Sequence, residues 1–262
     1  LTVTGVQTCA LPISENHQIV LPGEVISETT ENLMCGSGVA IRDGKIISTV
    51  RGYVTQISQL LSVTPITSIY SPNVGDVVVG RIAQVLKQRW KVKIGCSVLA
   101  TLRLSSIYLP DEQFRRRTTA DERNMRQYFD VGDIICAEVQ QIQADGLVFL
   151  HTRQQHPRRL ENGMTIEVPS RLIKRVQFNI SVMKIDGFDF NCIFGLNGVI
   201  WISPKDVGSI HMIPRIRNCF ILLATYNQLI SVESIQEVYQ LTSELEVSKI
   251  VTEETAKSLG FI

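Results

Sequence analysis

Polar and apolar residues alternate along many short stretches of the chain, as in strands that bury one face. The clearest stretch is Arg89–Ile94, where Trp90, Val92 and Ile94 alternate with cations. Asp43-Gly44 and Asp145-Gly146 predict tight hairpin turns, and the run 45–57 is strand-like. Helical spacing appears over about 119–129, 213–228 and, with acidic faces, 233–262, while 164–185 mixes strand and helix signals. These patterns predict a mostly β protein with an α+β C-terminal part.

The middle of the chain shows a recognisable order of elements. Strand patterns cover 76–86, 89–94 and 98–104, and then a helix is expected to begin at Thr119, with Glu122 three residues later as in a capping box. Strand patterns return at 134–142 and 147–152. Three strands, a helix and two strands is the order of an OB fold, a five-stranded barrel that often binds oligonucleotides.

Boundaries follow from turn residues and linkers. We expect a β-rich domain over 19–72, an OB barrel over 73–154, and an α/β domain with C-terminal helices over 155–262. Residues 1–18 are set aside, because Val3–Ile13 reads like the translation of a sequencing-library adapter. The chain has 262 residues, 44% hydrophobic and 19% charged, as in an ordinary globular protein. No apolar run approaches the roughly 18 residues that span a bilayer, so no membrane association is expected.

The net charge of +1 hides an uneven distribution. Residues 75–117 contain nine Lys or Arg against three Asp or Glu, a net of +6. Residues 233–262 contain two Lys against six Glu, a net of −4. A basic middle favours a polyanionic partner for the barrel, and an acidic end favours a different one for the C-terminal region.

The cations of the 89–94 strand share one face. Side chains alternate along a strand, so Trp90, Val92 and Ile94 belong in the core while Arg89, Lys91 and Lys93 face water. A row of cations on a rigid surface suits a sugar–phosphate backbone. For an isolated pattern of this kind, a merely solvated strand face is the favoured explanation. The barrel context, with Arg81, Lys87 and Arg103 nearby, favours RNA binding.

A second basic segment, Arg115-Arg116-Arg117, precedes the predicted helix. It fits an RNA-guiding loop or, equally, a docking site for an acidic protein. The candidate RNA-binding residues are therefore these three arginines and the cations of and around the barrel strands: Lys87, Arg89, Lys91, Lys93, Arg103, Arg115, Arg116, Arg117 and Arg153.

The segment Gly195-Leu196-Asn197-Gly198 fits the GxxG pattern of the loop with which KH domains clamp a nucleic-acid backbone. That loop joins two helices, whereas both flanks here are strand-like. Asn-Gly between apolar strands is a strong hairpin signal. We therefore predict that Gly195, Asn197 and Gly198 form a structural turn.

Enzyme and metal signatures are scarce. The sequence has no P-loop, GxSxG or HExxH motif, and its four histidines have no partner at ligand spacing. The six cysteines are scattered singly, so we expect reduced, buried thiols and a reducing compartment. We predict no catalytic residues, no metal site, no cofactor and no small-molecule substrate.

Several runs resemble the S1/KH cap subunit of the eukaryotic RNA exosome, of the fourth ribosomal-RNA-processing type. The resemblance covers about residues 19–240. It is carried by the runs VLPGE (20–24), GDVVVGRI (75–82), QRWKV (88–92), LSS (104–106) with LP (109–110) and RRR, LHTR (150–153), GLNG (195–198) with IWI (200–202), and RIRNC (215–219). The chain departs from that family at its start, and we expect its C-terminus to be short beyond about Leu241.

The resemblance implies an N-terminal β domain, a central S1 barrel and a KH-like domain whose GxNG turn is structural and packed between the S1 and KH domains. It implies a non-catalytic subunit that stabilises a ring of RNase PH-like subunits, beside other S1-containing cap subunits. That subunit guides single-stranded RNA into the channel for 3′–5′ processing and degradation, in the nucleus, nucleolus and cytoplasm. The alternative is a stand-alone S1/KH RNA-binding regulator outside the exosome, and a nuclease is a third hypothesis.

Overall fold

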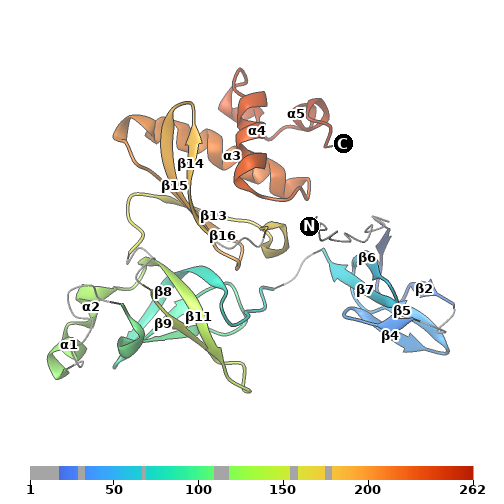
Figure 1. Ribbon diagram of the computed structural model, residues 1–262, viewed down its shortest axis with the longest axis horizontal. Helices are drawn as coiled ribbons and strands as arrows, with labels where there is room; N and C mark the ends of the chain where they lie inside the picture. Colours follow the sequence, from blue (N-terminus) through green and yellow to red (C-terminus); the bar gives the residue numbers. More distant parts are fainter. Residues whose placement is uncertain are drawn as a thin grey trace, which may run out of the picture. The chain divides into compact units, whose positions relative to one another are not determined.

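The computed structural model describes residues 18–28, 33–66, 69–108, 118–153, 159–174 and 179–261. The chain forms two compact units, 1–68 and 69–262 (Figure 1). The described residues of the first form short strands, and the second contains a closed five-stranded barrel followed by a sheet with helices. The expected fold class, mostly β with an α+β C-terminal part, is confirmed. No described helix is long and apolar enough to span a membrane.

The N-terminal unit contains two small sheets. One has the strand order β1-β6-β7-β3 and the other has the order β2-β5-β4. Their bounds are β1 Ile19–Val20, β2 Val25–Ser27, β3 Met34–Cys35, β4 Val39–Arg42, β5 Lys45–Ser48, β6 Gly52–Ile57 and β7 Leu60–Pro65. Asp43 and Gly44 take positive φ angles of 51° and 75°, as the predicted hairpin turn between β4 and β5 requires.

One expectation for this unit is wrong. The strand-like run 45–57 is two strands, because the chain turns between Ser48 and Gly52 and β5 and β6 belong to different sheets. The Ser48 hydroxyl donates to the carbonyl of Val50 at 2.6 Å, a local bond that replaces strand pairing at the turn. The buried core of this unit includes Val20, Ile46 and Val63.

The second unit begins with the barrel, whose strand order is β10-β12-β11-β8-β9. β10 and β12 run parallel and close it, while the other neighbouring strands pair antiparallel. The strands are β8 Val77–Leu86, β9 Arg89–Lys93, β10 Ala100–Arg103, β11 Ile134–Ile142 and β12 Val148–His151. The helical segment lies between β10 and β11, so the predicted OB order is confirmed.

Alternation along β9 places its apolar residues in the barrel core. Trp90, Val92 and Ile94 are fully buried or nearly so. The Trp90 indole nitrogen donates to the carbonyl of Phe129 at 2.9 Å, and the two rings meet edge to face at 5.6 Å. The helical segment therefore closes one end of the barrel by satisfying the polar atom of its largest core residue.

The helix predicted from Thr119 to about Phe129 is two short helices, α1 Thr119–Arg123 and α2 Met125–Tyr128, separated at Asn124. The N-cap is Thr118 and its capping-box partner is Asp121, so the predicted cap at Thr119 with Glu122 is wrong by one residue. Thr118 donates from its backbone nitrogen to Asp121 Oδ2 at 2.7 Å. Asn124 lies at the break with φ −95° and ψ 16°, outside the helical region, and asparagine is a weak helix former.

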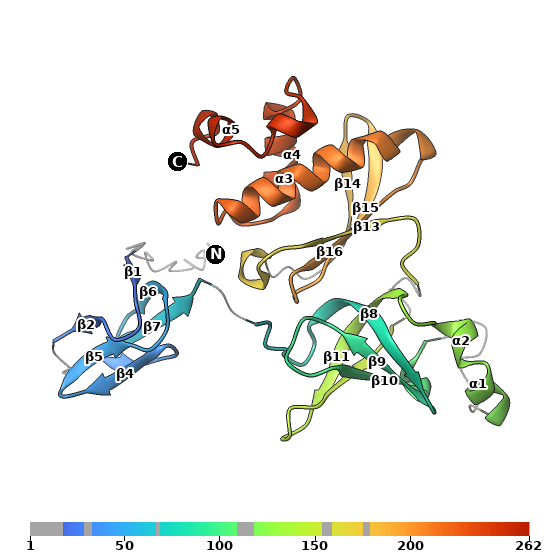
Figure 2. The same ribbon diagram turned by 180° about the vertical axis from the view of Figure 1, so that it is seen from behind.

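The C-terminal part is a four-stranded antiparallel sheet with the strand order β13-β16-β15-β14, covered on one face by helices (Figures 1 and 2). Its strands and helices are β13 Met164–Glu167, β14 Ile180–Ile185, β15 Phe188–Phe194, β16 Val199–Pro204, α3 Ile213–Thr225, α4 Val232–Leu241 and α5 Glu253–Ser258. The predicted helix over 213–228 and the amphipathic helices after 233 are confirmed.

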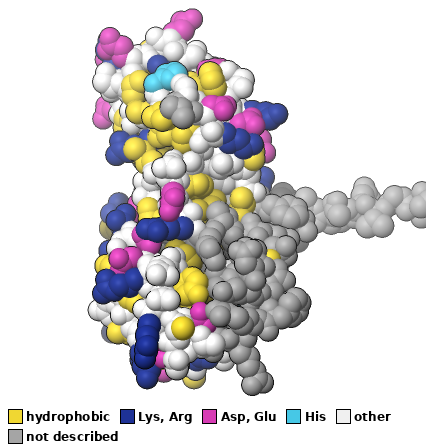
Figure 3. Space-filling view, turned by 90° about the vertical axis from the view of Figure 1, so that its left-hand side faces the viewer, with side chains coloured by type: hydrophobic (Ala, Val, Ile, Leu, Met, Phe, Trp, Pro, Cys, Tyr) yellow, Lys and Arg dark blue, Asp and Glu magenta, His cyan; other side chains and the backbone are white. Residues whose placement is uncertain are grey.

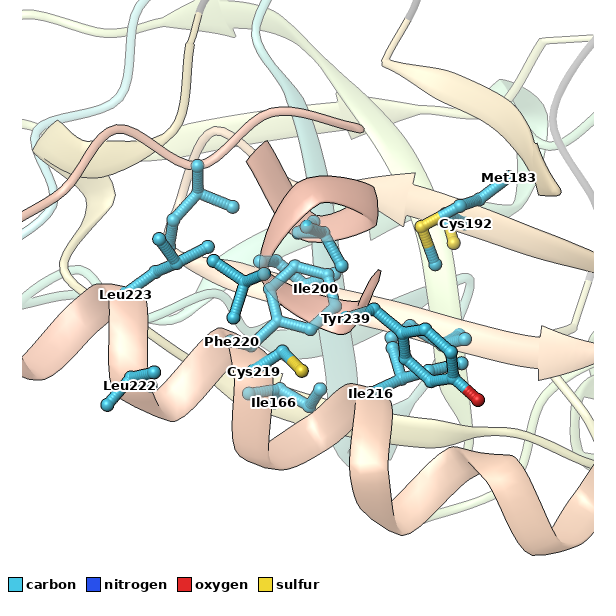
Figure 4. Close-up of a cluster of buried hydrophobic side chains, with 14 of the residues drawn as sticks. Ile166, Met183, Cys192, Ile200, Ile216, Cys219, Phe220, Leu222, Leu223 and Tyr239 are labelled. Atoms are coloured by element: carbon cyan, nitrogen blue, oxygen red, sulfur yellow. The ribbon is translucent and has the colours of Figure 1, made fainter. Parts of the chain in front are cut away.

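This sheet buries alternate residues against α3. Cys192 on β15 and Ile200 on β16 lie in one apolar cluster with Ile216, Cys219 and Phe220 of α3 (Figure 4). Among the described cysteines, Cys136, Cys192 and Cys219 are buried as expected. Cys35 is exposed, so the expectation of a buried thiol is wrong there, because the short β3 lies at the edge of its sheet.

Candidate nucleic-acid interface

The cationic side of β9 lies on the outer face of the barrel. Arg89 and Lys93 are exposed and Lys91 is half-buried. Lys91 Nζ donates to the hydroxyl of Thr101 on β10 at 2.9 Å, so this side chain lies flat across two strands. At about 3.3 Å per residue, Arg89 and Lys93 lie about 13 Å apart along the strand. The row therefore suits a few nucleotides of extended backbone.

A shallow hollow of about 400 Å³ lies at the Arg89 end of this row. Its lining consists of Lys87, Gln88, Arg89, Arg103, Leu104, Ser105 and Glu122. The turn between β8 and β9 is held in place, because Gln88 has a φ of 60°, accepts a bond from Leu104 N at 2.9 Å, and donates through its side chain to Glu122. Three of the predicted RNA-binding cations, Lys87, Arg89 and Arg103, thus share one preformed hollow.

Phe149 on β12 is a candidate that the sequence reasoning missed. It is half-buried on the outer face and pairs with Thr101 of β10 in the barrel register. The Arg103 guanidinium lies 4.3 Å from its ring centroid. A ring and a guanidinium plane are both surfaces on which a nucleobase stacks. The signal was present in the sequence, since Val148 and Leu150 flank Phe149 and take the buried side of the strand.

Arg153 differs from the other candidates. Its guanidinium donates to Glu138 at 2.6 Å and to the His151 ring at 3.1 Å. Glu138 is largely buried, so this ion pair is more protected than a surface pair. The charge of Arg153 is therefore less available to a phosphate than that of Arg89. The predicted residues Arg115, Arg116 and Arg117 lie outside the described residues.

The turn at Gly195–Gly198 joins β15 to β16 and contacts the barrel. Asn197 is buried, and its side-chain amide donates to the carbonyls of Val79 at 2.8 Å and Ile94 at 2.9 Å. Its Oδ1 accepts from Val79 N at 3.2 Å. The side-chain amide of Asn197 thus bonds to the backbone of Val79 on β8 and of Ile94, the residue that follows β9. It holds the C-terminal domain against the barrel.

Both glycines of this turn are required by close contacts. Gly198 has a φ of +87°, and a Cβ there would lie 2.3 Å from the carbonyl oxygen of Val168. A Cβ at Gly195 would lie 2.9 Å from the backbone nitrogen of Val79. The turn is therefore closely packed between the barrel and the C-terminal sheet.

The barrel face thus combines a cationic strand, a hollow and an aromatic ring. OB folds bind oligonucleotides on strands two and three and on the turn between strands one and two, which here are β9, β10 and the Lys87–Gln88 turn. The space-filling view shows Lys and Arg side chains on the lower half of the molecule, with hydrophobic side chains among them (Figure 3). Such a face can bind phosphates electrostatically and stack a base.

Comparison with known protein families gives matches to three parts of the chain. The family "Exosome complex exonuclease RRP4 N-terminal region" matches residues 19–57. The families "RRP4, S1 domain" and "KH domain" match residues 69–141 and 163–208.

Named relatives cover most of the chain. The "Exosome complex component RRP4 homolog" of Caenorhabditis elegans is 33% identical over 95% of this chain and 87% of its own length. The "Exosome complex component RRP4" of Mus musculus is 34% identical over 94% of this chain and 88% of its own length. The Saccharomyces cerevisiae protein of that name is 41% identical over 71% of this chain and 51% of its own length. The chain therefore belongs to the RRP4 family of exosome complex components.

Proposed function

We propose that this protein is the RNA-binding S1/KH cap subunit of an RNA exosome. The observation that carries the proposal is family membership over nearly the whole chain, combined with a barrel whose outer face bears free cations. Among the described residues, no ion pair involves Lys87, Arg89 or Arg103. The subunit binds single-stranded RNA along β9 and guides it toward the channel of the complex.

The proposal includes the partners and the location. The subunit stabilises a ring of RNase PH-like proteins, together with other S1-containing cap subunits, and acts in the nucleus, nucleolus and cytoplasm in RNA processing and degradation. It contributes no catalytic residue of its own. In support, the candidate RNA face is built from cations, a hydroxyl and an aromatic ring. Incubation with labelled RNA, magnesium and phosphate is expected to give no degradation.

Assembly is tested by purifying the tagged chain from native extract. Co-elution with RNase PH-like proteins supports the cap subunit. Elution as a lone monomer supports the alternative, a stand-alone S1/KH regulator, and contradicts the proposal.

The RNA face is tested by reversing the charges of Arg89, Lys91 and Lys93 to Glu. Each single-strand phosphate contact contributes about 0.7 to the slope of log affinity against log salt, so the triple variant is expected to lower that slope by about 2. A control with the same change in net charge reverses three exposed cations of the C-terminal domain, Lys184, Arg217 and Lys257. Equal RNA affinity for the two variants would show that β9 is not the RNA-binding strand.

A further inference from the structure

A second hollow, of about 270 Å³, lies between the barrel and the C-terminal sheet. We call it the interdomain groove. Its lining consists of Val79, Gly80, Arg81, Lys93, Gly95, Ile134, Thr165, Glu167, Val168, Asn197, Gly198 and Val199. Lys93, at the end of the β9 cation row, is one of its walls. The groove is therefore continuous with the candidate RNA face.

The barrel wall of the groove is cationic. Arg81 on β8 and Lys93 on β9 are directly opposite one another in the strand register, and both are exposed. Neither forms an ion pair with a described residue. Two neighbouring cations with no counter-charge attract an anion, and a phosphate oxygen accepts hydrogen bonds from both.

The opposite wall offers acceptors instead. Thr165 and Glu167 belong to β13, which is the edge strand of the C-terminal sheet. Glu167 is exposed, and no ion pair with a described residue engages it. A carboxylate repels a phosphate but accepts a hydrogen bond from a hydroxyl group. The groove is thus complementary to a ligand that carries an anionic group at one end and a hydroxyl group at the other.

The two walls are fixed relative to each other. Asn197 lies in the floor and bonds to Val79 and Ile94, and Leu196 N donates to the carbonyl of Val77 at 2.9 Å. The apolar cluster of Val79, Cys136, Leu160, Ile193 and Trp201 joins the same two domains. A groove whose walls are already joined loses little entropy when a ligand binds.

We propose that the interdomain groove binds one nucleotide of the RNA, with its phosphate on Arg81 and Lys93 and its ribose 2′-hydroxyl donating to Glu167. This rests on the proposed RNA-binding function and extends it. The C-terminal domain then contacts RNA through the edge of β13, while its GxNG turn holds the domains together. Because DNA lacks the 2′-hydroxyl, Glu167 makes the site selective for RNA.

The test measures affinities of the full chain for a single-stranded RNA and for DNA of the same sequence. A hydrogen bond to a charged group corresponds to about tenfold in affinity, so Glu167→Ala is expected to weaken RNA binding about tenfold without weakening DNA binding. Arg81→Gln is expected to weaken both about fivefold and to lower the salt slope by about 0.7. Lys257→Gln, an exposed cation far along the chain, is the matched control.

The possible outcomes distinguish the proposed nucleotide site in the groove from the proposed RNA-binding function of the whole subunit. If Glu167→Ala strengthens RNA and DNA binding alike, its carboxylate only repels phosphates and the nucleotide site is wrong. If Arg81→Gln matches the control while the β9 variant loses RNA binding, RNA binds to the barrel but bypasses the groove. If Arg81→Gln and Glu167→Ala leave RNA binding intact yet release exosome proteins, the groove is a protein contact. Absence of RNA binding by the unaltered chain overturns the proposed function itself.

Discussion

Replacing Asn197 with alanine tests whether one side chain holds the barrel to the C-terminal domain. The substitution leaves three buried backbone groups without their partners: the nitrogen and the carbonyl of Val79, and the carbonyl of Ile94. An unsatisfied buried group costs about 1–3 kcal/mol. Asn197 also lines the interdomain groove, so water can reach part of the vacated space. We therefore expect the free energy of unfolding to fall by about 3 kcal/mol in total, the lower end of the range for three such groups.

The assay is thermal unfolding followed by circular dichroism and calorimetry. For a unit of this size a loss of 1 kcal/mol lowers Tm by about 2–4 °C, so Asn197→Ala is expected to lower it by about 6–12 °C. Because the side chain joins two domains, we also expect one transition to become two. Asn191→Ala is the control, since Asn191 is a half-buried asparagine on the adjoining strand β15. A Tm shift no larger than that of the control, with a single transition, would show that Asn197 does not hold the two domains together.

Three further predictions follow from the same contacts. Phe149→Leu keeps an apolar side chain but removes the ring beside Arg103. It should weaken the binding of intact RNA by about 1–3 kcal/mol and leave the affinity for abasic RNA unchanged. Equal losses of affinity for both RNAs would exclude stacking on Phe149. Gly198→Ala, at a φ of +87° and 2.3 Å from a carbonyl oxygen, should destabilise the protein in urea by more than 1 kcal/mol, about the cost of a strained residue, and wild-type stability would contradict the geometry. Burial raises the pKa of Cys136 and Cys192 to about 12, so these thiols should resist alkylation at pH 8 while the exposed Cys35 reacts; rapid labelling of the buried thiols in the folded state would contradict this. Because the thiols ionise more easily in the unfolded chain, the stability they contribute should be lost as the pH rises toward 12.

Local patterns predicted much of the fold. Alternation alone assigned Trp90 and Val92 to the core and Arg89 to the surface, because a strand cannot present neighbours on the same face. Turn chemistry placed the hairpin at Asp43-Gly44 for an equally local reason. The order of strands and helix then restricted the barrel to one known topology.

Contacts between distant residues were beyond such patterns. Asn197 bonds to Val79 across 118 positions, and nothing in the flanking residues identifies that partner. The neutralisation of Arg153 by Glu138 depends on the pairing of β11 with β12. For this reason the sequence patterns did not distinguish Arg153 from the other cations. They did not identify Phe149 either, because its role depends on its position beside Arg103.

We infer that this RRP4-family protein contacts RNA through β9 while assembled in an exosome. Ultraviolet crosslinking of single-stranded RNA to the complex purified through the tagged chain, with the crosslinked peptides identified by mass spectrometry, tests it most directly. We expect exosome partners in the purified sample and crosslinks on peptides containing Arg89–Lys93 and Phe149. A chain purified without partners, or crosslinks confined to the C-terminal helices, would contradict it.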